Sequence, residues 1–265
     1  MKIVAQVLMV IALFFAVWFS LEKIDWMTIF KVEKFTRSTE EKLGDMFWEI
    51  FDKSGKGIHK SEIMIPLDSM LTRICTSNKI DKKKIKLHII KSDEINAFAL
   101  PNNHLLLCSE LIISSEDEAE LAGVISHELA HLQLKHVMKK LVKEVGLSLL
   151  ISMATGESGG KIIEETVKLL SSTAYDRKLE KEADIKAVDY LINADINTEP
   201  FANFMYKQAD KELNIGKHLV WISTHPGSIE RAKYIIDYSK GKSKNVHPIL
   251  SKSTWDKLKE SLKEQ

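Results

Sequence analysis

The stretch from residue 116 to about residue 141 constrains the fold more than any other, because it predicts a long helix with an apolar centre. Acidic side chains fill its first turn and lysines close its far end, which the helix dipole favours. Three polar side chains, His127, Glu128 and His131, interrupt the apolar centre. A buried helix tolerates such groups only when a partner compensates for their lost hydration, so the rest of the chain must supply one.

His127 and His131 stand four residues apart, so a helix places both imidazoles on one face, one turn apart. Both can then bind one zinc ion, while Glu128 projects beside the metal, where it can accept a proton from a zinc-bound water. The competing interpretation is that both histidines are ordinary core groups. His136 follows His131 by five residues, about 140° round a continuous helix, so it is predicted to face away from the metal and to be structural.

The helix that carries His127 and His131, called the zinc helix below, does not itself supply the third ligand that a catalytic zinc site requires. In the metzincin pattern a glycine and a histidine would follow, but Leu134 and Val137 occupy those two positions. The alternative is a carboxylate from a second helix.

An acidic run in YDRKLEKEADIKAVDYL (175–191) offers such a carboxylate. Glu180 and Asp184 are again four residues apart, so one can bind metal while the other orients a ligand imidazole. Arg177 stands one turn before Glu180 and can balance the acidic pair. The competing interpretation of this run is a solvated charged face.

Strand patterns follow one another between residues 84 and 108. KIKLHII (84–90) alternates polar and apolar residues, and NAFAL (96–100) and HLLLC (104–108) are separated by the turn PNN. The last two predict a hairpin beside the first strand, and therefore a small antiparallel sheet. The predicted fold is α+β and mostly helical, with further helices at 22–50, 60–77, 161–193, 199–213, 228–239 and in a docked tail after residue 240.

The first segment, IVAQVLMVIALFFAVWFS (3–20), contains no charged residue and predicts a membrane anchor. As a helix it spans about 27 Å, close to the hydrocarbon thickness of a bilayer. Trp18 suits the membrane interface, and the residues around Ser20 form a poor signal-peptidase site. We expect an uncleaved anchor; a cleaved signal and a buried soluble helix are the alternatives.

Charge and cysteine content exclude several other classes of protein. The formal net charge of +1 gives no electrostatic case for nucleic-acid binding. Two cysteines, Cys75 and Cys108, are too few for a disulfide scaffold or a cysteine zinc site. We expect them to be unpaired, with a disulfide as the alternative.

Four motifs in one order make the chain resemble the M48 family of zinc metallopeptidases, which are gluzincins, and within it the BepA-like and Oma1-like branch with a single anchor or signal. The resemblance covers roughly residues 60–240. The motifs are an edge strand in NAFALPNNHLLLCSEL (96–111), the zinc helix in HELAHLQLKH (127–136), an arginine-x-x-glutamate-x-x-alanine-aspartate signature in RKLEKEAD (177–184), and a threonine-histidine-proline loop in THPGSIERA (224–232). The chain departs from the family pattern at Asn102 and Asn103, where glycines are usual, and at Asp176, where serine is common.

The resemblance implies roles for single residues. Glu180 becomes the third zinc ligand and Asp184 its support. His225 becomes a catalytic residue beside Glu128, in contact with the water or the transition state, while Arg231 bonds structurally near the zinc helix. The edge strand would pair with an extended substrate backbone through Asn96, Ala97, Phe98 and Ala99.

The predicted function is a zinc-dependent endopeptidase with one zinc ion per chain, acting in membrane or envelope protein quality control. Zinc polarises a water and the scissile carbonyl, and Glu128 takes the proton of the water and passes it to the leaving amine. The expected partners are protein or peptide substrates, unfolded or membrane-associated, and a membrane at residues 3–20. The rivals are a non-proteolytic chaperone or assembly factor, and a membrane-tethered scaffold.

The predicted organisation has four parts. We expect an anchor at 1–21, a helical linker at 22–59, the metallopeptidase domain at 60–240 and a basic helical tail at 241–265. The expected location is a membrane, with the catalytic domain on the periplasmic or extracytoplasmic side; a soluble periplasmic protein after signal cleavage is the alternative.

Overall fold

The computed structural model describes residues 32–213, 220–242 and 245–265, together with isolated positions between residues 6 and 15. Contacts divide the chain into two units, residues 1–40 and residues 41–265, and the second holds the sheet and the candidate site.

The predicted anchor at residues 3–20 lies, apart from those isolated positions, outside the described residues, as do residues 22–31 of the helix predicted at 22–50. Within the described part of the chain, no helix combines the length and the apolar character needed to cross a bilayer.

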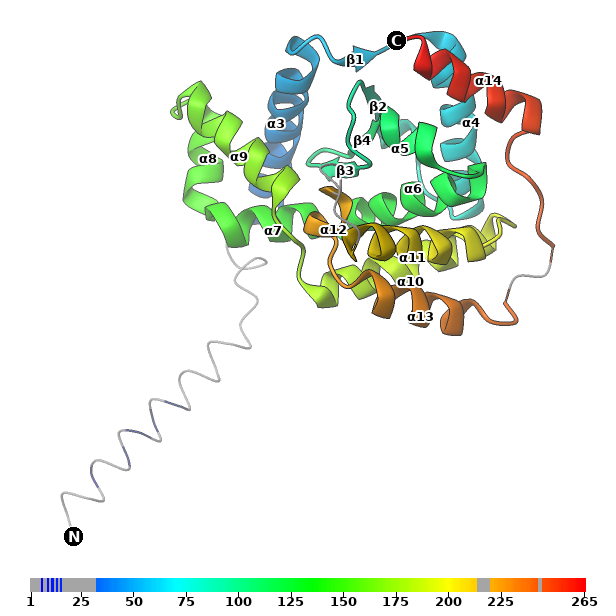
Figure 1. The fold of residues 1–265 in the computed structure, drawn as a ribbon. Coiled ribbons are helices and arrows are strands. Elements are labelled where there is room, and N and C mark those ends of the chain that lie inside the picture. Colours follow the sequence, from blue (N-terminus) through cyan, green and yellow to red (C-terminus); the bar gives the residue numbers. More distant parts are fainter. Residues whose placement is uncertain are drawn as a thin grey trace. The chain divides into compact units, whose positions relative to one another are not determined.

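Helices dominate the described residues, with one small sheet among them (Figure 1). The helices predicted at 60–77, 199–213 and 228–239 are confirmed within a residue, and Pro66 lies inside the first of them without ending it. The helices are α3 (Val32–Lys53), α4 (Ser61–Ser77), α5 (Ser109–Ser114), α6 (Glu118–Gln133), α7 (His136–Val145), α8 (Leu147–Thr155), α9 (Gly160–Ser172), α10 (Arg177–Asn193), α11 (Glu199–Leu213), α12 (Val220–Thr224), α13 (Ser228–Ser239) and α14 (Lys252–Lys263), with a short 3-10 turn at Lys82–Lys84. The strands are β1 (Gly57–Ile58), β2 (Lys86–Ile90), β3 (Ala97–Leu100) and β4 (His104–Cys108).

The sheet is mixed, so the predicted all-antiparallel arrangement is wrong. Its order is β1-β2-β4-β3, with the predicted hairpin of β3 and β4 present as an antiparallel pair. The hairpin docks through its second strand, so β4 runs parallel to β2, with Lys86 opposite His104 and Ile90 opposite Cys108. Every residue of β4 is buried, which suits the interior position of this strand. The hairpin therefore leaves β3 as an edge strand of the sheet.

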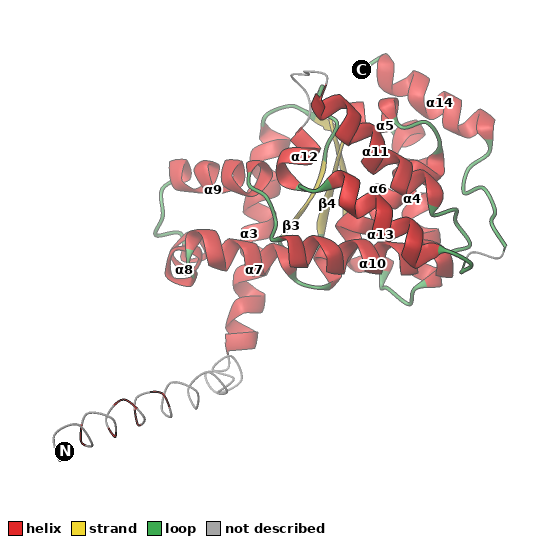
Figure 2. Ribbon diagram, turned by 60° about the horizontal axis from the view of Figure 1, so that its bottom comes forward, coloured by secondary structure: helices red, strands yellow, loops and turns green. Residues whose placement is uncertain are grey.

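Helix α6, which carries His127 and His131, packs against β3 on one side and against α10 and α11 on the other. α10 and α11 each contact both α6 and α13, so these four helices, which Figure 2 shows close together, form a bundle. Gly123 permits the close crossing of α6 and α11, because a Cβ atom there would lie 2.4 Å from the Cβ atom of Phe201. Burial at this crossing holds the zinc helix in the core.

Two predicted long helices are each broken in the structure. The helix predicted from 116 to 141 ends at Gln133, and α7 starts at His136 after Lys135, whose φ of 59° lies in the left-handed region. The helix predicted at 161–193 consists of α9 and α10, separated by residues 173–176. The first break brings His136 against the candidate site, and the second brings Tyr175 against it. A continuous helix would have directed these side chains elsewhere.

Candidate metal centre

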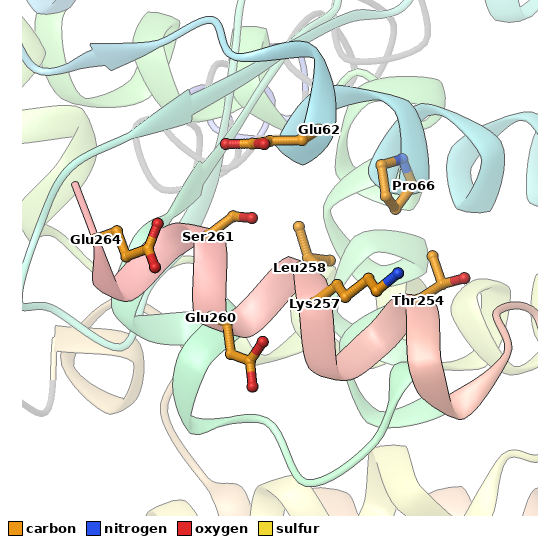
Figure 3. A pocket seen from close by; sticks show the side chains of 8 residues that line it. All are labelled: Glu62, Pro66, Thr254, Lys257, Leu258, Glu260, Ser261 and Glu264. Carbon is orange, nitrogen blue, oxygen red and sulfur yellow. The ribbon is translucent and has the colours of Figure 1, made fainter.

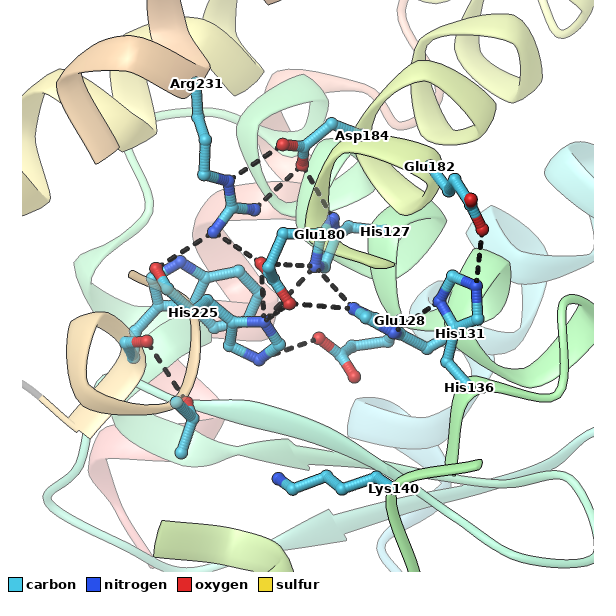
Figure 4. A network of polar contacts seen from close by, with 12 residues as sticks. His127, Glu128, His131, His136, Lys140, Glu180, Glu182, Asp184, His225 and Arg231 are labelled. Carbon is cyan, nitrogen blue, oxygen red and sulfur yellow. Dashed lines mark hydrogen bonds and ion pairs between the residues drawn. The ribbon is translucent and has the colours of Figure 1, made fainter. Parts of the chain in front are cut away.

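Four buried side chains from three parts of the chain converge on one point. His127 and His131 come from α6, Glu180 from α10, and His225 from the residue after α12. One ligand atom from each lies within 4.8 Å of the others. Figure 4 shows these groups facing one another, with Glu128 beside them.

The spacing of the three predicted ligands fits a tetrahedral zinc ion. Nε2 of His131 lies 3.0 Å from Nε2 of His127 and 3.3 Å from Oε1 of Glu180. Nε2 of His127 lies 3.6 Å from Oε2 of Glu180. Ligand atoms at zinc–ligand distances of 2.0–2.1 Å in a tetrahedron stand about 3.3 Å apart. Two imidazoles and a carboxylate are also the donor set of many catalytic zinc sites, so these residues fit the metal.

His127 and Glu180 are held by a network of charged groups behind them. Nδ1 of His127 lies 2.8 Å from Oδ1 of Asp184. The guanidinium of Arg231 donates two hydrogen bonds of 2.8 Å to Asp184 and lies 2.6 Å from Oε2 of Glu180. The hydroxyl of Tyr234 also donates to Asp184. The predicted structural bond of Arg231 thus takes the form of an ion pair with both acids.

Arg177, which was predicted to balance the two acids, lies outside this network. It is the first residue of α10 and is exposed to solvent. The three-residue spacing from Glu180 favours neighbouring positions on the helix, but it is Arg231 on α13 that contacts both carboxylates. The sequence signal for Arg231 was its place in the threonine-histidine-proline loop.

The charged network keeps both acids ionised. Burial alone would raise the pKa of Asp184, but Arg231 and His127 outweigh burial and lower this pKa to about 2. Burial likewise opposes ionisation of Glu180, and His225 and Arg231 hold its pKa well below the usual range. An ionised Glu180 is what a cation requires of its carboxylate ligand.

Glu128 lies beside the donor cluster with its carboxyl group fully buried. Neither of its oxygens has a hydrogen-bond partner of good geometry among the described residues, and Nε2 of His225 lies 3.4 Å from Oε1. Burial and the neighbouring Glu180 raise the pKa of Glu128 well above its usual range. A divalent cation among the donors would oppose that shift, since a nearby positive charge favours the carboxylate.

His225 was predicted to contact the water or the transition state. In the structure it also lies directly against two of the predicted ligands. Its Nδ1 atom lies 3.0 Å from Oε1 of Glu180 and 3.3 Å from Nε2 of His127. Its ring stacks on Trp221 with 4.0 Å between the centroids. His225 is therefore able to act as a fourth donor in the arrangement seen here, as well as to contact a substrate group.

Tyr175 and Lys140 border the centre and were not predicted as part of it. The Tyr175 ring stacks on His131 with 4.1 Å between the centroids, and Nζ of Lys140 lies 4.3 Å from the Tyr175 centroid. Lys140 is buried and donates hydrogen bonds to the carbonyl groups of Leu170 and Thr173 at the end of α9. Burial lowers its pKa to about 8. The sequence did not predict the break between α9 and α10, and this break positions Tyr175.

The predicted substrate strand borders the same centre. Asn96 is buried just before β3, and Ala97, Phe98 and Ala99 are buried within it. The Ala99 backbone lies near enough to Glu128 to favour its charged form. One edge of β3 pairs with β4, and the sheet adds no further strand at the other edge among the described residues.

A surface pocket lies elsewhere, between α4 and α14 (Figure 3). Its cavity of about 300 Å³ includes none of the candidate site residues. The cysteines also lie apart from the centre: Cys75 and Cys108 are both buried and unpaired.

Several known proteases are similar in sequence to this chain. The sequence pattern of peptidase family M48 matches residues 66–238. The chain is 23% identical over 199 residues to the beta-barrel assembly-enhancing protease of Yersinia pestis, covering 71% of this chain and 41% of the relative. It is 23% identical over 204 residues to the mitochondrial metalloendopeptidase OMA1 of Schizosaccharomyces pombe, covering 76% and 60%. It is 27% identical over 167 residues to the metalloprotease LoiP of Escherichia coli, covering 60% and 65%. The match thus spans less than two thirds of the length of each of these relatives.

Proposed function

Because the chain belongs to peptidase family M48, we propose that it is a zinc-dependent endopeptidase that hydrolyses peptide bonds at the centre around His127, His131 and Glu180. The observation that carries the proposal is the combination of tetrahedral donor spacing with an adjacent buried carboxyl group, Glu128, that lacks a hydrogen-bond partner of good geometry. A buried carboxyl group without a partner destabilises the fold, whereas beside a metal and a water molecule it can accept the proton of the water. One zinc ion per chain would be held by the two imidazoles and the Glu180 carboxylate.

Bound zinc would supply Lewis acidity toward the water and the scissile carbonyl. Glu128 would accept the proton of the water and deliver it to the leaving amine, as a general base and then a general acid. His225 would act beside Glu128, since its Nε2 atom already lies 3.4 Å from Oε1. Asp184 would hold Nδ1 of His127, so that Nε2 presents its lone pair to the metal.

We propose that β3 binds the substrate by adding an extended peptide to its outer edge. The main-chain groups of an edge strand are free to pair, so recognition would depend little on side-chain identity. The buried side chains of β3 would stay in the core while its backbone contacts the peptide. This mode suits unfolded or membrane-associated protein substrates.

The setting that we propose is membrane or envelope protein quality control. The similarity of the chain to a beta-barrel assembly-enhancing protease and to a mitochondrial metalloendopeptidase supports it. The uncharged segment at residues 3–20 would provide the anchor, with the catalytic domain on the extracytoplasmic side.

The decisive experiment compares the wild type with Glu128→Gln. We expect both proteins to bind zinc at one ion per chain, and only the wild type to cleave an unfolded protein substrate. His131→Ala should lose both zinc and cleavage. If Glu128→Gln cleaves as fast as the wild type, the assignment of the base is wrong. A wild type that binds zinc and captures unfolded protein without ever cleaving it would favour the chaperone or assembly factor instead.

A further inference from the structure

We propose that His136 and Glu182 form a positioning relay that orients His131 toward the metal, in the way that Asp184 orients His127. This inference rests on the proposed zinc site, and it gives a role to a histidine that the sequence pattern had predicted to face away. The relay runs from Glu182 on α10, through His136 at the start of α7, to His131 on α6 (Figure 4).

The break between α6 and α7 brings His136 to the site. In a continuous helix, a residue five positions after His131 would lie about 140° away round the axis. Lys135 adopts φ 59° and ψ 27°, which turns the chain at that point. As a result Nδ1 of His136 lies 3.1 Å from Nδ1 of His131, and the His136 side chain is fully buried. The prediction that His136 points away is wrong because it assumed an unbroken helix.

Metal binding fixes the direction of every hydrogen bond in the relay. Nε2 of His131 faces Nε2 of His127 and the Glu180 carboxylate, so this is the nitrogen that must offer its lone pair to zinc. A neutral His131 then carries its proton on Nδ1 and donates it to Nδ1 of His136. His136 in turn must carry its own proton on Nε2.

Glu182 is the acceptor that this last proton requires. Oε2 of Glu182 lies 3.3 Å from Nε2 of His136. That nitrogen is buried and makes no hydrogen bond of good geometry among the described residues, so Glu182, at ion-pair distance, is the acceptor available to it. With this acceptor, every proton between His131 and Glu182 has one assigned position. The carboxylate also holds the His136 ring in the orientation in which Nδ1 accepts the hydrogen bond from His131.

The two zinc-binding histidines are therefore supported differently. His127 meets the buried carboxylate of Asp184 directly at 2.8 Å, whereas a neutral imidazole separates His131 from its carboxylate. Glu182 is also 41% exposed, so solvent screens its charge. We expect the relay to orient His131 more than to increase its basicity, and its loss to weaken zinc binding less than loss of Asp184.

The test measures zinc affinity by competition with a chromophoric chelator. Partners of this kind contribute about 10–100-fold to metal affinity, so we expect His136→Leu to weaken zinc binding by at least about tenfold. His136→Asn keeps an acceptor near the position of Nδ1 and should recover most of that loss. Cobalt substituted for zinc should show a shifted visible spectrum in His136→Leu and a spectrum close to that of the wild type in His136→Asn.

The chain offers a matched control in His104, which is also buried but lies in the sheet, where it contacts His88 and Asp45. His104→Leu should lower stability without changing zinc affinity or the cobalt spectrum. If His136→Leu does not fold, Glu182→Ala tests the same relay from the surface, with the exposed Glu164→Ala on α9 as its control.

The outcomes separate the relay from the metal site itself. A wild type that binds no zinc overturns the proposed function. A wild type that binds zinc, with folded His136→Leu or Glu182→Ala binding it equally tightly, overturns the relay alone. Weakened binding in His136→Leu without recovery in His136→Asn also contradicts it, because the loss would then be one of packing.

Discussion

Arg231 and Asp184 form a two-point ion pair in the core, with Nε and Nη2 of the guanidinium each 2.8 Å from a carboxylate oxygen. A third nitrogen, Nη1, donates to the backbone carbonyl of His225 at 2.9 Å and lies beside Glu180. One side chain on α13 therefore contacts the support of His127, the predicted ligand Glu180 and the backbone of His225.

Removing Arg231 should be costly for the whole fold. Breaking a buried ion pair by deleting one partner typically costs about 3–5 kcal/mol, because the other charge is left buried and unpaired. We expect Arg231→Met to lower the free energy of unfolding by about that amount in urea denaturation of zinc-free protein. The control is Lys143→Ala, whose exposed pair with Asp176 should leave the unfolding free energy unchanged. Equal small effects of both variants would contradict the role given to Arg231.

The depressed pKa of Asp184 predicts how stability depends on acid pH. The pKa of this carboxyl group is about 2 in the folded chain, against an ordinary value of 3.8, so its charge stabilises the fold above pH 3.8. That contribution, about 2 kcal/mol, should be lost as the pH falls from 3.8 toward 2. We therefore expect zinc-free wild type and Asp184→Asn to differ in unfolding free energy at neutral pH and to converge at acid pH. Parallel curves across this range would show that Asp184 does not titrate as described.

The parts of the site that were predictable from sequence are those fixed by local geometry. The four-residue spacing of His127 and His131 places both on one helix face wherever that helix lies. Glu180 needed its signature as well, since spacing alone left Glu180 and Asp184 interchangeable. The structure brings Glu180 to the two imidazoles and sets Asp184 behind His127.

The parts that were missed depend on where a chain turns or on which distant segments meet. Lysine is not a residue that signals a left-handed turn, so the break at Lys135 and the position of His136 could not be read locally. Residues 173–176 carry no glycine or proline, so the stacking of Tyr175 on His131 was equally hidden. The choice of Arg231 over Arg177 is made by the packing of α13 on α10.

The sequence of β4 contained one indication of the mixed sheet. The continuous apolar run of β4 is typical of a strand buried on both faces, and such strands often lie in the interior of parallel or mixed sheets. The alternation in β2 and the turn between β3 and β4 predicted a strand and a hairpin, but neither pattern indicates which strand of the hairpin pairs with β2. Long-range pairing of β4 with β2 decided the order instead.

Tyr175 should stabilise the centre by packing more than by its hydroxyl group. The ring contacts both His131 and the Lys140 ammonium group, so Tyr175→Phe keeps these contacts and should have nearly wild-type stability. Tyr175→Ala removes a buried aromatic side chain and should cost about 3–5 kcal/mol of unfolding free energy. Thermal and urea denaturation of both variants measure this. A large loss in Tyr175→Phe would show that the hydroxyl group, and not the ring, is the important part.

Lys140 should link the end of α9 to the centre. Its ammonium group donates to two carbonyl groups, those of Leu170 and Thr173, which Lys140→Met would leave without this donor. An unsatisfied buried polar group costs about 1–3 kcal/mol, so we expect a loss of that order in unfolding free energy. Faster amide exchange at the end of α9, with exchange in α4 unchanged, would locate the effect. Uniform change across the chain would contradict this local role.

The turn at Lys135 offers a test of the backbone that places His136. A non-glycine residue in the left-handed region is strained by about 1 kcal/mol, and glycine adopts that region freely. Lys135→Gly should therefore leave the free energy of unfolding equal to that of the wild type or slightly higher, and should keep zinc affinity. Lys135→Val should lower both, because a β-branched residue resists this conformation and would draw α6 and α7 toward a continuous helix, with His136 turned from His131. Zinc affinity that is unchanged in a folded Lys135→Val protein would show that the turn does not control the position of His136.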